Sequence, residues 1–219
     1  MTDDDLDDDT MGVPMSTSEP TQWQRMVEGR SYRSTDPELS AARAATKRIL
    51  HEYNTTHPDD EATRDRLLRG LLKSAGEMIW IEPPFRCDYG SQITFGTGIF
   101  ANYDLSILDC APVTIGNMVL FGPRVTLATA SHPIDFTQRT VDMYEYAEPI
   151  TIEEGAWLGA HVVVGPGVTI GAHSVIGAGS VVTRDIPPNV VATGVPCKVV
   201  REITAQDREA YLQAYGTAG

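Results

Sequence analysis

The sequence predicts a mainly β fold, a solenoid of short strands that follows a small helical cap. Large apolar residues recur every six positions between residues 115 and 182, with one interruption between 127 and 152. The positions in phase are Ile115, Phe121, Leu127, Ile152, Leu158, Val164, Ile170, Ile176 and Val182. Glycine follows six of these nine residues, whereas the glycine content of the chain predicts about one. Neither the period of a helix nor that of a simple strand explains this pattern.

Two further sets of residues keep the six-residue period. The fourth residue after each apolar position is small or β-branched, at Val119, Val125, Ser131, Ala156, Val162, Val168, Ser174 and Ser180. An earlier apolar set has the same period and a four-residue phase slip before Ile115, at Ile81, Cys87, Ile93, Ile99 and Leu105. The pattern is typical of short strands joined by tight turns, where glycine allows close approach of the backbone. Such a prism buries its core only by stacking coil on coil.

Four segments follow one another along the chain. Residues 1–20 combine an aspartate run with little apolar surface, which predicts a disordered acidic tail. Residues 21–76 are predicted as the helical cap, with one helix beginning at Asp36 before Pro37 and a second at Asp59 and Asp60. The solenoid is expected over residues 77–203, with a polar loop at 133–149. Residues 204–219 are expected to form a C-terminal helix or tail.

The composition limits which partners the protein can bind and in which cellular compartment it is expected. Acidic residues outnumber basic ones 30 to 17, and the net charge of -13 argues against binding to nucleic acid or to an anionic membrane surface. No stretch approaches the ~20 continuous apolar residues of a membrane span, and no secretory signal is evident. Cys87, Cys110 and Cys197 form no CxxC pair. We therefore expect a soluble protein in the reducing cytoplasm.

Several stretches outside the generic repeat resemble a known family. They read GRSYRSTDPEL, IFANYDLSILDCAPVTIG, TASHP and VVTRDIPPNVVATGVPCKVV. The chain from about Gln22 to Ile203 resembles the maltose and galactoside O-acetyltransferases, which belong to the hexapeptide-repeat acyltransferases. The resemblance implies a left-handed parallel β-helix, a homotrimer with active sites between subunits, and acetyl-CoA as the donor for acetylation of a sugar hydroxyl.

His132 is the candidate catalytic residue. It stands at the root of the long polar loop, and functional residues collect on long loops of rigid scaffolds. A sugar hydroxyl is a weak acid, and an imidazole within hydrogen-bond reach can take its proton as the new bond forms. His132 also matches the catalytic histidine of the family, which implies a general base in direct transfer. A lone histidine can also be structural, and Cys110 is the nearest rival as a nucleophile, although packing is its favoured role.

Cofactor-binding residues are predicted near the end of the solenoid. Arg184, Lys198 and Arg201 concentrate positive charge there, where the phosphates of acetyl-CoA need it; charge alone also fits solvated surface cations. The resemblance implies that these three residues contact CoA. It also implies that Ala160, Ala178 and Thr183 line the slot for the pantetheine arm.

His161 and His173 are considered as metal ligands, because β-helix carbonic anhydrases bind zinc through histidines. They lie twelve residues apart, which is two hexads or two of the three faces of a prism, so they point in different directions within one chain. The five-residue histidine spacing of those anhydrases is missing. We expect no catalytic metal and interpret both histidines as exposed turn or ladder residues.

The resemblance places the acceptor sugar among polar residues from several segments. These are Asp88, Asn102 and Glu145, with Arg43 from the helical cap. Carboxylates and amides suit vicinal hydroxyls because they accept and donate hydrogen bonds in fixed geometry. Asp36 falls in the same motif, but its place before Pro37 favours a helix N-cap.

The sequence departs from the galactoside enzymes at two positions. Phe100 stands where they have tyrosine, and Cys110 stands where they have an acid that holds the sugar, while Asp109 is kept. These differences favour the maltose type, with glucose or maltose as acceptor. Two alternatives stay open: another acceptor such as an antibiotic or serine, and a non-catalytic β-helix used as a binding module.

Overall fold

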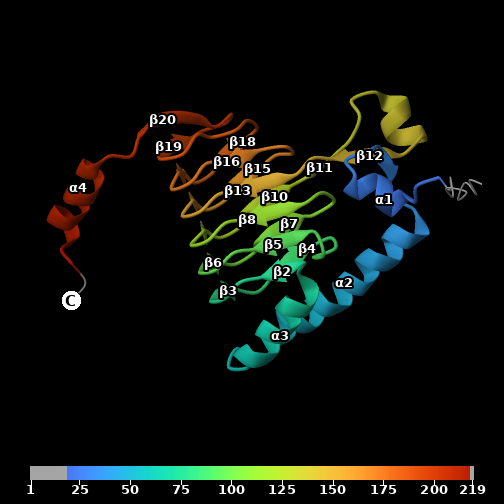
Figure 1. Cartoon of the computed structure of the whole chain (residues 1–219), viewed down its shortest axis with the longest axis horizontal. Coiled ribbons are helices and arrows are strands. Elements are labelled where there is room, and N and C mark those ends of the chain that lie inside the picture. The colour runs from blue at the N-terminus through green and yellow to red at the C-terminus, as the bar shows by residue number, and fades with distance from the viewer. Residues whose placement is uncertain (1–18, 218–219) are drawn as a thin grey trace, which may run out of the picture.

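The computed structural model describes residues 19–217, so the predicted acidic tail lies outside it except for its last two residues. The described chain forms a three-sided parallel β-helix with helices packed at its N-terminal end (Figure 1). The predicted fold class is confirmed. None of the described helices is long and apolar enough to cross a bilayer.

The N-terminal cap contains three helices and one short strand. These are α1 (Gln22–Val27), β1 (Tyr32–Arg33), α2 (Pro37–Thr55) and α3 (Glu61–Leu71). Asp36 caps α2 by accepting a hydrogen bond from the Glu38 amide at 2.9 Å, which confirms its interpretation as an N-cap. Asp60 caps α3 in a similar way, by accepting a hydrogen bond from the Thr63 amide. The sequence did not predict helix α1. Helices α2 and α3 bury Leu50 and Leu68 against the first coil of the β-helix.

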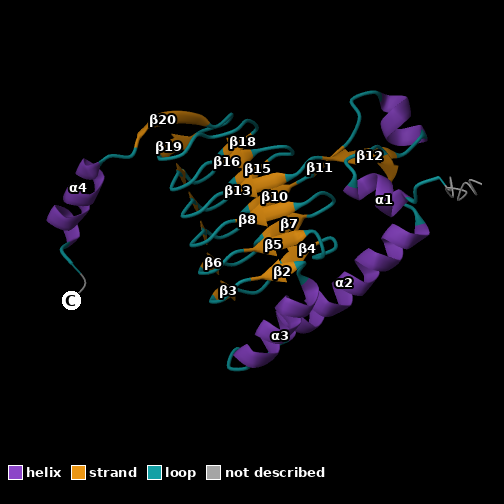
Figure 2. Cartoon of the chain, in the orientation of Figure 1, coloured by secondary structure: helices purple, strands orange, loops and turns teal. Residues whose placement is uncertain are grey.

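Three parallel sheets form the sides of the β-helix (Figure 2). The first face contains β2 (Ser74–Ala75), β5 (Ile93–Phe95), β8 (Val113–Ile115), β13 (Ile150–Ile152) and β16 (Thr169–Ile170). The second face contains β3 (Ile79–Ile81), β6 (Ile99–Ala101), β9 (Leu120–Phe121), β14 (Trp157–Leu158), β17 (Val175–Ile176), β19 (Val190–Thr193) and the antiparallel β20 (Lys198–Glu202). The third face contains β4 (Arg86–Cys87), β7 (Ser106–Leu108), β10 (Thr126–Ala128), β15 (Val163–Val164) and β18 (Val181–Val182).

The core lies along the axis of this prism. All nine apolar residues predicted from the six-residue period are buried, with at most 1% of their surface exposed. They stack in register from coil to coil, as Leu127 does on Val164 and Val164 on Val182. The six-residue period therefore identifies residues that are buried in the core.

The predicted four-residue phase slip is wrong, because the first two coils are longer than six residues at one corner. Cys87 pairs with Ile107, and Phe95 pairs with Ile115. In the first two coils the spacing at this corner is therefore eight residues, from Cys87 to Phe95 and from Ile107 to Ile115. Later coils have six, from Val164 to Ile170. The extra residues lie at the corner between the third and first faces. Consequently Ile81 and Cys87 belong to the large aliphatic set, whereas Ile93, Ile99 and Leu105 are equivalent to the small or β-branched set.

The third coil carries its long insertion at this same corner. Residues 129–149 contain β11 (Ala130–Ser131), a single π-helical turn η1 (Thr137–Val141) and β12 (Tyr144–Ala147). Strand β12 pairs antiparallel with both β11 and β1, which ties the insertion to the helical cap. Ser131 therefore lies in the insertion and not in the predicted column of small corner residues.

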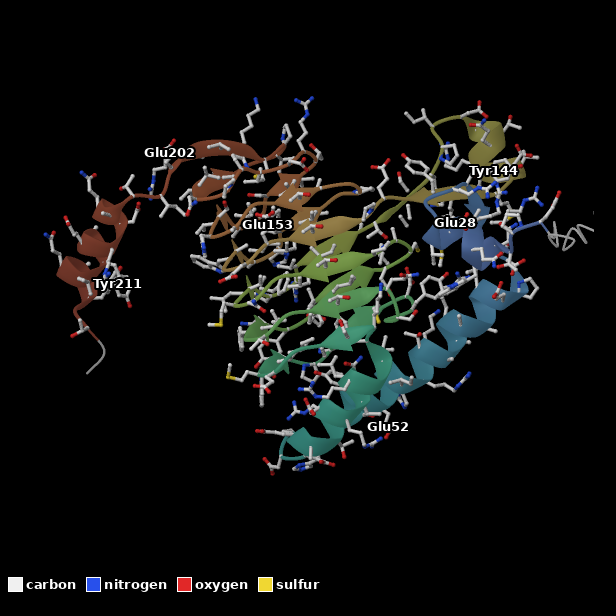
Figure 3. All side chains as sticks on the ribbon, viewed as in Figure 1. Glu28, Glu52, Tyr144, Glu153, Glu202 and Tyr211 are labelled. Carbon is white, nitrogen blue, oxygen red and sulfur yellow. The ribbon has the colours of Figure 1, made fainter. Side chains whose placement is uncertain are left out.

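The C-terminal helix α4 (Ala205–Tyr215) stands apart from the β-helix, and Tyr211 projects from it (Figure 3). None of its residues is buried. The link to β20 is a pair of hydrogen bonds from Arg201 to Asp207, at 2.9 and 2.6 Å. These contacts fix the beginning of the helix.

The close stacking of coils can be tested at two glycines. A Cβ atom added to Gly159 would lie 2.8 Å from the Ala178 nitrogen, whereas one added to Gly165 would lie 3.5 Å from the Val182 oxygen. We expect Gly159→Ala to lower the free energy of unfolding by about 1 to 3 kcal/mol, because a backbone neighbour must shift.

The matched control, Gly165→Ala, should leave stability unchanged or slightly raised. Denaturant unfolding at one protein concentration measures both variants. Equal stability of the two would contradict this account of coil stacking.

Candidate active site

Several predicted site residues gather at the corner between the third and first faces. Asp88 directly follows β4, Arg43 reaches across from α2, and Glu145 lies on β12. In the β11–β12 hairpin, Ser131 pairs with Tyr146, which carries His132 to the level of Glu145. His132 is exposed in a single chain. The extended corner thus brings together a histidine, two carboxylates and a guanidinium group from four segments.

A hydrogen-bond network connects this corner to the helical cap. The Tyr32 hydroxyl donates to Glu145 Oε2 at 3.0 Å, and the Ser34 hydroxyl donates to Glu145 Oε1. Arg43 Nη1 donates to the Tyr89 hydroxyl at 2.6 Å, and its Nη2 donates to the Ser34 carbonyl oxygen at 2.5 Å. Neither Arg43 nor Glu145 is therefore a free surface charge, because each is oriented by neighbours.

Cys110 lies behind Asp88 and is 5% exposed. Its Sγ contacts Asp88 Oδ2 at 3.7 Å. Burial raises the pKa of the Cys110 thiol to about 12, and burial also raises the pKa of the Asp88 carboxyl. Because the thiolate is the nucleophilic form, a protonated and enclosed Cys110 suits packing better than acyl transfer.

Asp109 has a different environment from its neighbour. It is fully buried, and its carboxylate accepts hydrogen bonds from the backbone amides of Asp88 (3.0 Å), Tyr89 (2.9 Å) and Gln92 (3.4 Å). Burial raises its pKa to about 7, against the opposing effect of these amides. The carboxylate of Asp109 thus binds backbone amides within the corner and does not face outward.

Asn102 and the two predicted alanines lie on another edge of the prism. Asn102 follows β6, and its side-chain oxygen accepts from the Tyr103 amide at 2.8 Å. Ala160 and Ala178 follow β14 and β17 at the same corner, between the second and third faces. The width of the third face separates this edge from Asp88 in one chain. A single chain therefore does not bring all the predicted site residues together.

The predicted cofactor cations lie at the C-terminal end of the β-helix. Thr183 and Arg184 follow β18, and Lys198 and Arg201 belong to β20. Arg201 is held in a bidentate ion pair by Asp207, which lowers the pKa of that carboxyl to about 2. Arg184 and Lys198 are exposed, and neither forms an ion pair within residues 19–217.

His161 and His173 are exposed turn residues, as their spacing predicted. Their φ angles are 59° and 60°, a left-handed conformation in which histidine is enriched. They follow different faces, because His161 comes after β14 and His173 after β16. Within the described chain, no group of three or more His, Cys, Asp or Glu side chains could hold a metal ion.

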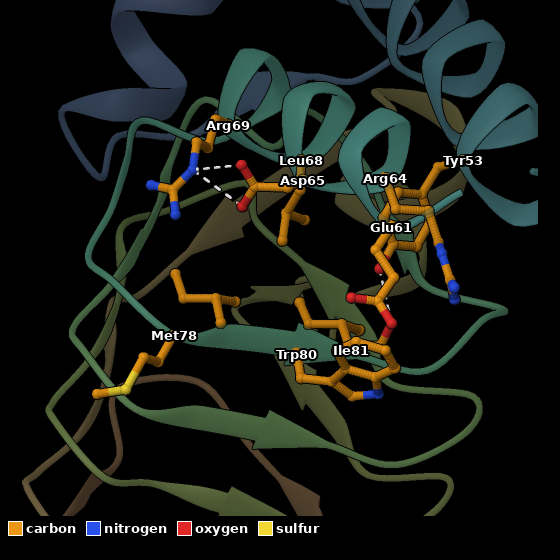
Figure 4. Close-up of a pocket in the computed structure, with 10 residues that line it drawn as sticks. Tyr53, Glu61, Arg64, Asp65, Leu68, Arg69, Met78, Trp80 and Ile81 are labelled. Atoms are coloured by element: carbon orange, nitrogen blue, oxygen red, sulfur yellow. Dashed lines mark hydrogen bonds and ion pairs between the residues drawn. The ribbon is translucent and has the colours of Figure 1, made fainter. Parts of the chain in front are cut away.

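A separate pocket of about 190 Å³ lies between α3 and β3 (Figure 4). Its lining includes Trp80 and Arg64, whose guanidinium carbon lies 5.5 Å from the centre of the Trp80 ring. Asp65 and Arg69 form an ion pair at its rim, at 2.9 Å. None of the predicted site residues lines this pocket, so the cavity and the candidate chemistry occupy different parts of the molecule.

Comparison with known proteins identifies the family. A model of the maltose acetyltransferase hexapeptide capping motif matches residues 25–76, and a bacterial transferase hexapeptide model of six repeats matches residues 149–184. Galactoside O-acetyltransferase of Escherichia coli (strain K12) is 43% identical over 206 residues, which cover 94% of this chain and 97% of that protein. This chain belongs to the maltose and galactoside O-acetyltransferase family. The resemblance noted from the sequence is confirmed.

Solved structures of this family agree with the fold. A galactoside acetyltransferase in complex with coenzyme A has a TM-score of 0.86 and 42% identity, covering 91% of this chain and 100% of that one. A maltose O-acetyltransferase from Clostridium difficile 630 has a TM-score of 0.83 and 42% identity, covering 85% and 100%.

Several residues that build the corner carry no signal in the sequence. Tyr32 and Ser34 lie within the GRSYRSTDPEL stretch, but nothing in that stretch indicated their contacts with Glu145. The pairing of Tyr32 with Glu145 joins segments 113 residues apart. The anchoring role of Asp109 was also missed, since it depends on the amides of a neighbouring coil.

Proposed function

We propose that this chain is an acetyl-CoA-dependent O-acetyltransferase that acts on a sugar hydroxyl, with glucose or maltose as acceptor. The observation that carries the proposal is the extended corner, where the β11–β12 pairing sets His132 level with Glu145 and hydrogen bonds orient Glu145 and Arg43 near Asp88. Membership of the family and the CoA complex of a relative support the choice of donor. The proposal requires no metal ion.

The proposed reaction is a direct transfer with His132 as general base. The imidazole takes the proton of the acceptor hydroxyl while the hydroxyl oxygen bonds to the acetyl carbon. The carbon–sulfur bond breaks, and the CoA sulfur leaves and receives the proton from the imidazole. Glu145 and Asp88 accept hydrogen bonds from other hydroxyls of the sugar, since each carboxylate oxygen has more than one acceptor position. Arg43 donates to the same ring.

The proposed donor site runs along the edge that carries Ala160 and Ala178. Small side chains on successive coils leave room there for an extended pantetheine arm. Thr183, Arg184 and Lys198 lie towards the end of the prism, where the phosphates of CoA would bind. Arg201 belongs to the same proposed group, but it shares its guanidinium with Asp207 and contributes only its remaining N–H groups.

We propose a homotrimer because the two edges of the site are separate in one chain. A neighbouring copy would bring the edge with Asn102 and Ala160 next to His132 and Asp88. The second face supports this assembly, since its outward side chains form an exposed apolar ladder in register. The ladder consists of Trp80, Phe100, Leu120 and Trp157, which are 38 to 50% exposed.

The outward side chains of the first face are polar by contrast. They form a threonine ladder of Thr94, Thr114, Thr151 and Thr169. This difference favours the second face as the contact between copies and the first face as solvent-exposed. A cytoplasmic location belongs to the same proposal, supported by three free thiols.

Replacement of His132 tests the general base. We expect His132→Ala to lower kcat by roughly 10²- to 10⁴-fold with little change in the KM for acetyl-CoA, because it removes proton transfer and not donor binding. Release of CoA thiol in the presence of sugar measures the rate.

The control is His173→Asn, since His173 is an exposed turn residue after the first-face strand β16 and asparagine tolerates its left-handed backbone. This variant should keep wild-type turnover. Near-native turnover of His132→Ala would place the base elsewhere.

The acceptor preference follows from the environment of Cys110. A protonated thiol cannot replace the charge-assisted hydrogen bond that an acid gives, and its loss costs about 1.5 to 3 kcal/mol, or about one to two orders of magnitude. Asp109 cannot compensate, because three amides hold its carboxylate. We expect glucose and maltose to have higher kcat/KM than methyl β-galactoside at saturating acetyl-CoA.

A clear preference for the β-galactoside would contradict the maltose-type assignment. Transfer to serine or an aminoglycoside but to no sugar would replace the proposed acceptor. No thioester cleavage with any acceptor would favour a binding module.

The proposed trimer is tested by measuring the mass of the protein in solution and by placing a charged residue on the second face. Light scattering should give about 71 kDa, three times the 23.8 kDa chain. Leu120→Asp should produce monomers with greatly reduced activity, because it places a charge in the apolar ladder. Thr114→Asp, one face away in the same coil, should remain a trimer. A fully active wild-type monomer would overturn the proposal.

A further inference from the structure

Asp109 is a buried carboxylate whose hydrogen-bond partners all belong to one loop. It has no exposed surface and forms no ion pair within the described residues. One oxygen accepts from the amides of Asp88 and Tyr89, and the other accepts from the amide of Gln92. Acidic residues are almost never fully buried unless they are paired, so this site is specifically built around three backbone donors.

The loop that Asp109 holds, residues 88–92, carries groups assigned to the acceptor. Asp88 is one of them, and the Tyr89 hydroxyl fixes Arg43 at 2.6 Å. On its outer side the loop contacts the cap, where Thr46 donates to the Tyr89 carbonyl oxygen at 3.0 Å. Asp109 forms the inner support of the same loop. A change at Asp109 therefore affects both Asp88 and Arg43 without touching either side chain.

The next coil repeats this arrangement. Thr129 is fully buried, and its hydroxyl accepts from the Ala111 amide at 3.0 Å and donates to the Leu108 carbonyl oxygen at 2.6 Å. Because Leu108 pairs with Ala128, Thr129 is the position one coil after Asp109. In each case, the residue after a third-face strand holds the corner loop of the preceding coil. The same kind of hydrogen bond in two successive coils indicates that anchoring of the corner loop is a regular feature of the β-helix.

We propose that Asp109 is a positioning residue for acceptor recognition, which holds the 88–92 loop so that Asp88 and Arg43 meet the acceptor hydroxyls. The inference rests on the proposed function. Asp109 is fully buried, so it touches neither the acceptor nor acetyl-CoA and acts only through the loop residues assigned to the acceptor. Its effect is therefore confined to acceptor binding.

Asp109→Asn tests the role with minimal change of shape. The variant places an NH₂ group against the amide donors in place of one acceptor oxygen, so the loop should loosen. We expect the KM for the acceptor to rise about tenfold or more, as for the loss of one hydrogen bond to a charged group. The KM for acetyl-CoA should stay within about twofold, and the assembly should keep its mass.

The control is Asp65→Asn on α3, a helix that carries none of the predicted site residues. The Asp65 carboxylate forms an exposed ion pair with Arg69 at 2.9 Å. Its loss should change neither KM by more than about twofold, since exposed ion pairs contribute little. If Asp109→Asn fails to fold, Asp109→Thr replaces it, because Thr129 fills the equivalent position one coil later with a single acceptor.

Hydrogen exchange separates this inference from the proposed function. The amides of the 88–92 loop should exchange faster in the Asp109 variant than in the wild type, whether or not a sugar is the acceptor. Faster exchange with a raised acceptor KM supports the inference. Unchanged exchange overturns it, as does faster exchange with an unchanged acceptor KM or an equal rise in both KM values. Failure of the wild type to acetylate any sugar counts against the proposed function alone, and the KM comparison then uses the acceptor that it does acetylate.

Discussion

The stacking of each coil on the next by parallel backbone pairing is the constraint on which the rest of the structure depends. Corner positions such as Gly159 approach the following coil so closely that a side chain there would meet its backbone. Two of the three corners are therefore fixed in length through the first coils, and additional residues are accommodated at the corner between the third and first faces. The candidate active site lies where the fold allows the chain to leave the prism.

This arrangement explains why the site residues come from distant parts of the sequence. The corner loops after β4 and β7 and the insertion after β10 lie at the same edge, on successive coils. Strand β1 of the cap then pairs with β12 of the insertion, so that Tyr32 and Glu145 meet. The candidate site thus lies between the helical cap on one side and the corner of the β-helix on the other.

The sequence predicts the core more completely than the site, for a physical reason. Ile152 or Leu158 is identified by a period that every coil must obey, because each coil fills the same axis. The two extra residues per early coil disturb that period, so Ile93 and Ile99 were assigned to the wrong column. The contacts of Glu145 with Tyr32 and of Arg201 with Asp207 involve no period at all, since they depend on where two irregular segments meet. His132 was identified from its surrounding motif and from its place beside the insertion, and its role remains a proposal.

The neighbouring residues Asp109 and Cys110 show how acceptor recognition depends on the coil beneath it. Asp109 has the carboxyl group that a sugar-binding residue needs, but the amides of the 88–92 loop donate to both of its oxygens, and burial raises its pKa to about 7. Cys110 has the position beside Asp88 but remains a neutral thiol. An acid at Cys110 would put a second carboxylate against Asp88, whose pKa is already raised by burial, and one of the two would then favour protonation. The thiol leaves Asp88 as the one carboxylate of this pair that can face the acceptor, so the neutral side chain of Cys110 lowers the negative charge of the proposed sugar site.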